Sequence, residues 1–306
     1  MSQYSFFSLY PPLVHLRSQL FRLTPGIGAL FLAVTLLLAT THTQAGLVAL
    51  YDVEVLVTDE SSEVRQQAFI EGMNEIFVRI AGDSIVMDKL ASPEANHYVK
   101  KYSYVPVDKP PTNEKGEVLS RRLKIQYNGS LMEKYLRDNG FSVWGEHRSD
   151  VVVWVAVSDG KNQYVLKDAD KSLIKSVTSA ALTRRGIPEV WPLYDADDRN
   201  KISIADLRGG FEDQIVDASQ RYSRGPILTA RLSWNGKQWQ SSWSLLMVTG
   251  NHYWRLADKS YNSLINKAVD QAADAMGVVF AIRGAAENPY NSNIQLNVQA
   301  LDSIEK

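Results

Sequence analysis

The chain has 306 residues, 45% of them hydrophobic, and a formal net charge of −1 at neutral pH. That length suffices for about two globular domains, and the near-neutral charge argues against a nucleic-acid-binding protein. The chain has no cysteine, which excludes disulfide bonds, thiol catalysis and cysteine-held metal clusters but assigns no compartment.

Residues 1–45 predict a secretory signal peptide. Arg17 and Arg22 precede an uncharged apolar run, Ile27–Ala39, and small residues end the segment at Ala45. A basic start, an apolar run and a small-residue cleavage site are typical of an export signal. The run is shorter than the roughly 20 residues that span a bilayer, and no later apolar segment is longer. We therefore expect no transmembrane span after signal removal, with an uncleaved N-terminal anchor as the alternative.

Residues 46–148 predict a first α+β domain. Residues 48–57 and 118–127 alternate apolar and polar side chains, as half-buried strands do. Apolar residues then keep helical spacing from a cap at Ser61 or Ser62 as far as Gly82. Further expected elements are a short helix opened by Ser92-Pro93, an extended segment over 102–107, and a helix capped by Asn128.

Residues 149–283 predict a second α+β domain. The almost continuous apolar run Val151–Val157 indicates a central strand that is buried on both faces. One helix is expected after a cap at Asp170, and another over residues 211–222 with its first residue directed inward. An apolar stripe over residues 260–280 predicts an amphipathic helix that covers one face of the sheet.

Residues 226–248 predict a β-hairpin around Asn235-Gly236. This pair accepts positive φ at both central positions of a two-residue type I′ turn, which would place Trp234 opposite Lys237. One face of the hairpin would be apolar and aromatic and the other polar, so we expect helices on one face only. The hairpin tryptophans are core residues in this interpretation, and a carbohydrate or ligand platform is the alternative.

Residues 284–306 predict a polar linker followed by a short alternating strand at Ile294–Val298. A single strand is not a domain by itself. We therefore expect this strand to join an existing sheet, to pair with a partner, or to belong to a module that continues further.

Side chains with catalytic or metal-binding chemistry are scattered. His97, His147 and His252 lie in different predicted elements, and no pair has the spacing of metal ligands. The sequence shows no serine-hydrolase or dinucleotide-binding motif. We therefore predict no catalytic, cofactor-binding or metal-binding residues.

The predicted domain junction offers an alternative site, because junctions favour pockets. Glu146, His147 and Arg148 follow one another there. An acid–base or glycan-binding site would require these side chains to converge with Asp195 or Asp198 in a deep pocket.

A second alternative is a calcium site, because the twelve residues 195–206 imitate an EF-hand loop with acids at its first, third and last positions. Against it, Arg199 occupies a ligand position and Asn200 replaces the turn glycine. The other interpretation is an acidic loop that caps a helix beginning near Leu207. The carboxylates concerned are Asp195, Asp197, Asp198 and Asp206.

Seven stretches carry a family resemblance: Leu50–Val55 with Arg65–Ala68, Val78–Asp83, Val143–Gly145, Val153–Val155, Arg185–Pro188, Pro192–Asp195 with Asp198, and Ala218–Tyr222. Together they resemble a proteobacterial family of exported proteins, domain of unknown function number twenty-sixty-six. The resemblance covers most of residues 46–283 and implies export, but it implies no activity, ligand or catalytic residue. Ser149 departs from a proline expected there, and family members continue beyond a strand like Ile294–Val298.

We therefore expect a non-catalytic periplasmic protein that binds an envelope protein partner through its mixed-sheet domains. Export, two small α+β domains and a spare terminal strand favour this function. A periplasmic hydrolase or glycan-binding protein with a site at the domain junction is the alternative. The sequence leaves the oligomeric state open and calls for no cofactor.

Overall fold

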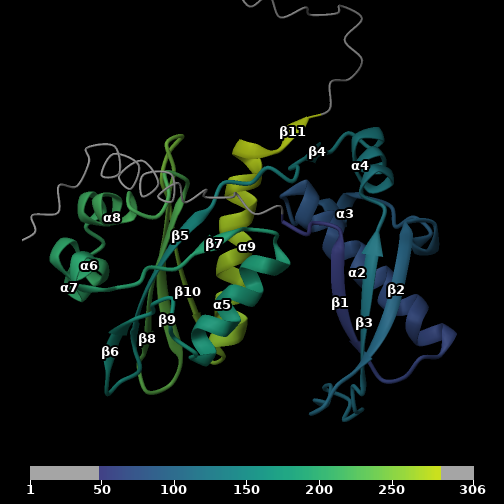
Figure 1. Ribbon diagram of the computed structural model, residues 1–306, viewed down its shortest axis with the longest axis horizontal. Coiled ribbons are helices and arrows are strands. Elements are labelled where there is room, and N and C mark those ends of the chain that lie inside the picture. The colour runs from purple at the N-terminus through teal and green to yellow at the C-terminus, as the bar shows by residue number, and fades with distance from the viewer. Residues whose placement is uncertain (1–47, 284–306) are drawn as a thin grey trace, which may run out of the picture. The chain divides into compact units, whose positions relative to one another are not determined.

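The computed structural model describes residues 48–283, which form two main sheets with helices packed against them (Figure 1). This confirms the predicted α+β class with mixed and antiparallel sheets. The predicted signal peptide, residues 1–45, and the predicted terminal strand, Ile294–Val298, lie outside the described residues. The boundary predicted after residue 148 falls in the segment that joins the two sheets.

The first sheet has three antiparallel strands in the order β1 (Asp52–Val57), β3 (Arg121–Tyr127) and β2 (Val99–Pro106). Alternate residues of β1 are buried, as the period-two pattern predicts. They pack against α2 (Ser62–Ala81), whose N-cap is Ser61 and whose C-terminus is closed by Gly82 at φ 69°.

Smaller elements complete this first region. They are α3 (Val86–Lys89), a 3₁₀ turn (Ala95–His97), α4 (Gly129–Asp138) and β4 (Ser142–Val143). Asn128 caps α4, as predicted. The helix predicted from Ser92-Pro93 is wrong, because this stretch is irregular and only the single 3₁₀ turn follows it.

The second sheet is mixed and larger. Its strands are ordered β10 (His252–Asp258), β9 (Trp239–Leu246), β8 (Ile227–Trp234), β5 (Val151–Ser158) and β6 (Gln163–Val165), and β7 (Glu189–Val190) also pairs with β5. β8 and β7 run parallel to β5, whereas the other pairs are antiparallel. Every residue of β5 but the last is buried, which confirms the predicted central strand.

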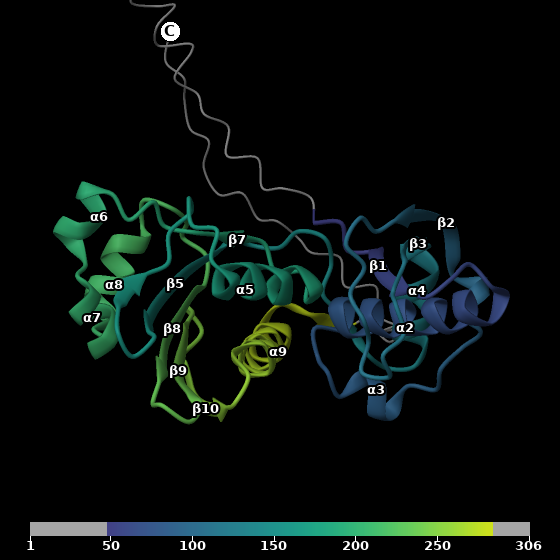
Figure 2. The ribbon, with the colours of Figure 1, turned by 90° about the horizontal axis from the view of Figure 1, so that it is seen from below.

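Helices lie on both sides of this sheet (Figure 2). On one side, α5 (Leu173–Arg184) and α9 (Tyr261–Phe280) pack against the apolar faces of β5, β8 and β9. On the other, α6 (Ala196–Lys201), α7 (Ile204–Gly209) and α8 (Glu212–Ser219) cover Val152 and Trp154. The second cover goes beyond the prediction of helices on one face, and it explains why β5 is buried on both.

The two-residue turn predicted for the β8–β9 hairpin is wrong. Trp234 pairs with Trp239, so four residues rather than two connect the strands. The Asn235 side chain accepts hydrogen bonds from the backbone N–H groups of Lys237 and Gln238, at 3.0 and 2.9 Å, and this favours the longer loop. Because the register differs by two residues, each side chain keeps its predicted face.

Two predicted helix starts also need correction. Ser172, not Asp170, caps α5, while the Asp170 carboxylate accepts a hydrogen bond from the Lys167 N–H. Phe211 is the N-cap of α8 and is half exposed rather than directed inward. The predicted cap and apolar stripe of α9 are confirmed.

A short strand after α9, β11 (Ile282–Arg283), pairs with β4 of the first region. The end of the second region is therefore hydrogen-bonded to the first. The sequence gave no indication of this pairing, because two-residue strands carry no detectable period.

Candidate functional site

Arg148, one of the predicted junction residues, is buried where the two regions meet. Its guanidinium donates hydrogen bonds to five backbone carbonyl oxygens at 2.7–3.2 Å and lies 4.0 Å from the centroid of the Trp144 ring. Burial lowers the pKa of Arg148, and the charges of Arg79 and Arg185 lower it further. All the hydrogen-bonding partners are structural carbonyls, so Arg148 fastens the chain rather than facing a ligand. The carbonyls belong to Arg79, Trp144, Gly145, Arg185 and Gly186.

Two further arginines are buried at the same place. Arg79 donates to three carbonyl oxygens of residues 49–52 and to Glu75, and Arg185 pairs with Asp270 and Asp274. These two and Arg148, here called the buried arginine cluster, are at most 4% exposed. Their donors are matched to acceptors within the chain, so the cluster is structural.

Glu146 and His147 point the other way and are exposed. They line a polar hollow of about 600 Å³ together with Tyr51, Lys100 and Glu133. Tyr51 donates a hydrogen bond to Glu133, and burial together with this bond raises the pKa of Tyr51. The predicted convergence of Glu146, His147 and Arg148 in one pocket is therefore not formed.

The segment predicted as a possible calcium loop is not a loop. It forms α6 and the start of α7, and its acids are used by these helices. Asp195 caps α6, while Asp206 and Ser203 form a capping box at α7, so helix capping occurs as the second interpretation expected. Within residues 48–283, no group of three or more acidic or histidine side chains is placed to hold a metal ion.

Asp198, in contrast, lies in a buried polar network. Its carboxylate accepts from the Tyr222 hydroxyl at 2.5 Å and from Arg221 at 3.0 Å, and Arg221 also pairs with Asp195. Burial, and then the bond to Asp198, raise the pKa of Tyr222 to about 12. Tyr194, which precedes this network, has φ 48°, a strained value for a non-glycine residue. Two stretches of the family resemblance thus meet in space.

The hairpin tryptophans differ from one another. Trp243 is 1% exposed, stacks on Trp254 at 6.3 Å and belongs to the core under α9. Trp239 is partly buried and packs edge-on against Tyr261 of that helix. Trp243 therefore forms part of the core, and the alternative of a three-tryptophan ligand platform loses its central residue.

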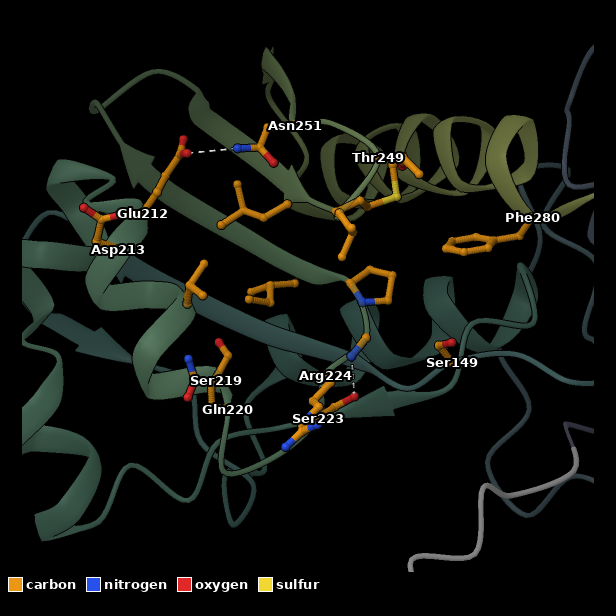
Figure 3. Close-up of a pocket in the computed structure, with 17 residues that line it drawn as sticks. Ser149, Glu212, Asp213, Ser219, Gln220, Ser223, Arg224, Thr249, Asn251 and Phe280 are labelled. Atoms are coloured by element: carbon orange, nitrogen blue, oxygen red, sulfur yellow. Dashed lines mark hydrogen bonds between the residues drawn. The ribbon is translucent and has the colours of Figure 1, made fainter. Parts of the chain in front are cut away.

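The largest hollow is an apolar groove of about 860 Å³ at one end of the second sheet (Figure 3). Its floor is formed by residues that start β8 and end β9, and its sides by α8 and the end of α9. We call this hollow the α8 groove. The apolar residues that line it are Val216, Pro226, Ile227, Leu246, Met247, Val248 and Phe280.

Several lining side chains of the α8 groove are exposed. Val248 is fully exposed, and Val216 and Phe280 are more than a third exposed. Large apolar side chains in a concave surface mark an interaction site more often than scattered ones do. Sequence analysis missed these residues because Val216 falls outside the apolar stripe of its helix, and an unpatterned valine carries no signal of its own.

Charged residues flank the α8 groove unevenly. Glu212 and Asp213 from the first turn of α8 lie at one end, and Phe280 lies at the other (Figure 3). Glu212 is held by hydrogen bonds from Asn251 and from Tyr253, at 3.0 and 2.5 Å. Arg224 lies beside the loop before β8. The groove therefore has a fixed acidic end and an apolar body.

None of the helices within residues 48–283 is both long and apolar enough to cross a membrane. The predicted lack of a span was made for the chain after signal removal, and over this range the finding agrees with it.

Comparison with known proteins gives one match. The profile of a domain of unknown function, DUF8605, matches residues 45–145. This range covers the first sheet with its helices and ends at Gly145, before the second sheet begins. No curated protein and no solved structure has significant similarity to the chain. The match supports the expectation that the chain contains a domain of unknown function, and it assigns no activity.

Proposed function

We propose that this protein is a non-catalytic, exported envelope protein that acts as a protein-binding or assembly module in the periplasm. The observation that carries the proposal is the α8 groove, whose apolar side chains are exposed and whose acidic end is fixed by hydrogen bonds. The partner that fits it is an extended protein segment with two or three apolar side chains and a basic residue near Glu212 and Asp213.

The separation of the junction residues supports a binding role over a catalytic one. A general acid and base must reach the same substrate, but Arg148 is enclosed by carbonyl oxygens while Glu146 and His147 face a different, open hollow. The periplasmic hydrolase or glycan-binding alternative therefore has less support than the protein-binding role.

The periplasmic location rests on residues 1–45, whose basic start, apolar run and small-residue end fit an export signal. Membership of the proteobacterial family number twenty-sixty-six is part of the same proposal. It is supported by the seven stretches given above, four of which have at least part of their residues beyond the 45–145 match.

The test is selection of binding segments from a library of extended peptides displayed on phage, using the full chain. We expect enrichment of peptides that combine apolar residues with one Lys or Arg. A Val216→Asp substitution in the groove should weaken the selected peptides by roughly tenfold or more. A Val278→Asp substitution provides the matched control, because Val278 is 83% exposed on α9 and does not line the groove.

The location is tested separately, by fractionation of cells that express the full chain. Recovery in the cytoplasm with residues 1–45 intact would contradict export. Failure to enrich any peptide, or enriched peptides that bind the Val216→Asp variant unchanged, would contradict the groove as the binding site.

A further inference from the structure

A second surface of the larger sheet is polar and basic. Arg231 of β8, Ser242 of β9 and Arg255 of β10 are direct cross-strand neighbours in one row, with Ala156 of β5 next to Arg231. Adjacent strands are about 4.8 Å apart, so the two arginines flank Ser242 with roughly 10 Å between their Cα atoms. The next row along the strands is Ser158, Ser233, Gln240 and Ala257.

These two rows line an open hollow of about 530 Å³. Arg208 of α7 also lines it, which brings three guanidinium groups to one surface. We call Arg208, Arg231 and Arg255 the exposed arginine cluster. None of the residues that line the hollow is acidic.

The charges of this cluster are not neutralised by other described residues. Between residues 48 and 283, no carboxylate lies within 4.0 Å of the charged nitrogens of the three arginines. Exposed arginines of the smaller sheet differ in this respect, since Arg121 pairs with Glu60 and Arg122 with Glu54. Like charges close together repel, so the arrangement favours a bound anion.

The site is also partly preorganised. The Arg231 guanidinium donates a hydrogen bond of 2.8 Å to the Arg208 carbonyl oxygen at the end of α7. It also lies against the backbone of Gly210, where an added Cβ would be 3.5 Å from its Nη1 atom. One donor thus fixes the group, and its remaining N–H groups have no hydrogen-bond partner among the described residues. A guanidinium held in this way loses less side-chain entropy when it binds.

We infer that the exposed arginine cluster binds an oxyanion of the phosphate type, either free phosphate or the phosphate group of a larger molecule. Guanidinium groups form paired hydrogen bonds to phosphate oxygens, and the Ser242 hydroxyl and Gln240 amide add uncharged donors between them. Phosphate carries up to two negative charges, which matches two or three arginines better than a single carboxylate does. This inference is independent of the α8 groove and of the proposed function.

The first arm of the test is isothermal titration of the full chain with inorganic phosphate at low ionic strength, against chloride of equal ionic strength. We expect saturable binding to phosphate. Arg255→Gln, and separately Arg231→Gln, should weaken it roughly ten- to a hundredfold, since each removes a charge-assisted pair of hydrogen bonds. Arg255→Lys should lose part of the affinity, because it keeps the charge without the paired geometry.

The second arm is sedimentation with vesicles of phosphatidylglycerol in phosphatidylcholine, which offers the same phosphate chemistry in a lipid headgroup. The apolar run Ile27–Ala39 could itself hold the full chain on vesicles. Vesicle binding therefore counts only if it falls with Arg231→Gln and Arg255→Gln. Binding in the first arm identifies a soluble phosphate ligand, and binding in the second arm alone identifies a headgroup.

Arg122→Gln is the matched control, since Arg122 is equally exposed on a sheet but paired with Glu54. The inference is overturned if neither arm shows binding, if both cluster variants bind as the wild type does, or if Arg122→Gln weakens binding equally. Should Arg231→Gln fail to fold because α7 loses its contact, the exposed Arg255 still decides the result.

Discussion

The two arginine clusters contain the same residue type in opposite surroundings. In the buried cluster, Arg79, Arg148 and Arg185 are enclosed and donate to carbonyl oxygens and carboxylates of the chain itself. The exposed cluster lines an open hollow without an acidic residue. The difference shows that an arginine's role depends on which acceptors surround it, because a guanidinium always needs acceptors and takes those of a ligand only where the chain supplies none.

The buried cluster predicts the largest effect. Arg148→Met keeps much of the side-chain volume but leaves five buried carbonyl oxygens without their donor, so it should lower the free energy of unfolding by about 3–5 kcal/mol. Urea unfolding measures the change. Arg137→Met is the control, because Arg137 is exposed and makes only an i,i+4 pair with Glu133. Equal stability losses in the two variants would contradict a structural role for Arg148.

The same joint predicts a steric effect where α2 and α9 touch. An added Cβ on Gly277 would be 2.0 Å from the carbonyl oxygen of Gly82, so Gly277→Ala must move one backbone. We expect a loss of about 1–3 kcal/mol, although alanine is ordinarily the better helix residue by about 1 kcal/mol. Gly145→Ala, where the added Cβ meets nothing within 4 Å, is the control. A more stable Gly277→Ala variant would show that the two helices do not touch in solution.

Arg221 lies between the two extremes and predicts a pH effect. It is partly exposed and helps hold Asp198, which also accepts from Tyr222. The folded-state pKa of Tyr222 is raised to about 12, above its ordinary 10, so its contribution to stability is complete below pH 10 and is lost as pH rises toward 12. The lost contribution should be about 1–2 kcal/mol after allowance for partial exposure. Thermal unfolding of wild type and Tyr222→Phe should therefore differ less at pH 11.5 than at pH 8, and a constant difference would refute the network.

The exposed cluster predicts the smallest effect on stability. Arg255→Gln should change the free energy of unfolding by no more than about 0.5 kcal/mol, because its side chain is exposed and makes no ion pair with a described residue. The measurement is urea unfolding without phosphate. A loss as large as that of Arg148→Met would erase the comparison and show that Arg255 is structural as well.

Much of the second sheet could be predicted from residue patterns. The apolar run Val151–Val157 indicated a strand buried on both faces, and the stripe of α9 indicated a covering helix, because burial dictates those periods directly. The hairpin register could not be fixed from Asn235-Gly236 alone. The Asn235 side chain stabilises a four-residue connection, and both registers place the same side chains on the same face.

The candidate sites were harder to predict than the elements. Glu146, His147 and Arg148 are consecutive, yet Arg148 turns inward while its neighbours face an open hollow, a division that depends on carbonyl oxygens from residues 79 and 185–186. The polar face of the hairpin was visible in the sequence. Its meaning was not, because the arginine of β10 and the end of α7 join that face only after folding.

By itself the sequence determined the α+β class, the central strand, the helix caps at Ser61 and Asn128, and the faces of the hairpin. Each of these follows from side chains within one or two turns of one another, where spacing and local hydrogen bonding decide the structure. Only the tertiary structure decided which arginines are enclosed, where the α8 groove opens and which carboxylates are already paired. Those outcomes depend on acceptors and apolar surfaces brought together from distant parts of the chain, and no local pattern records them.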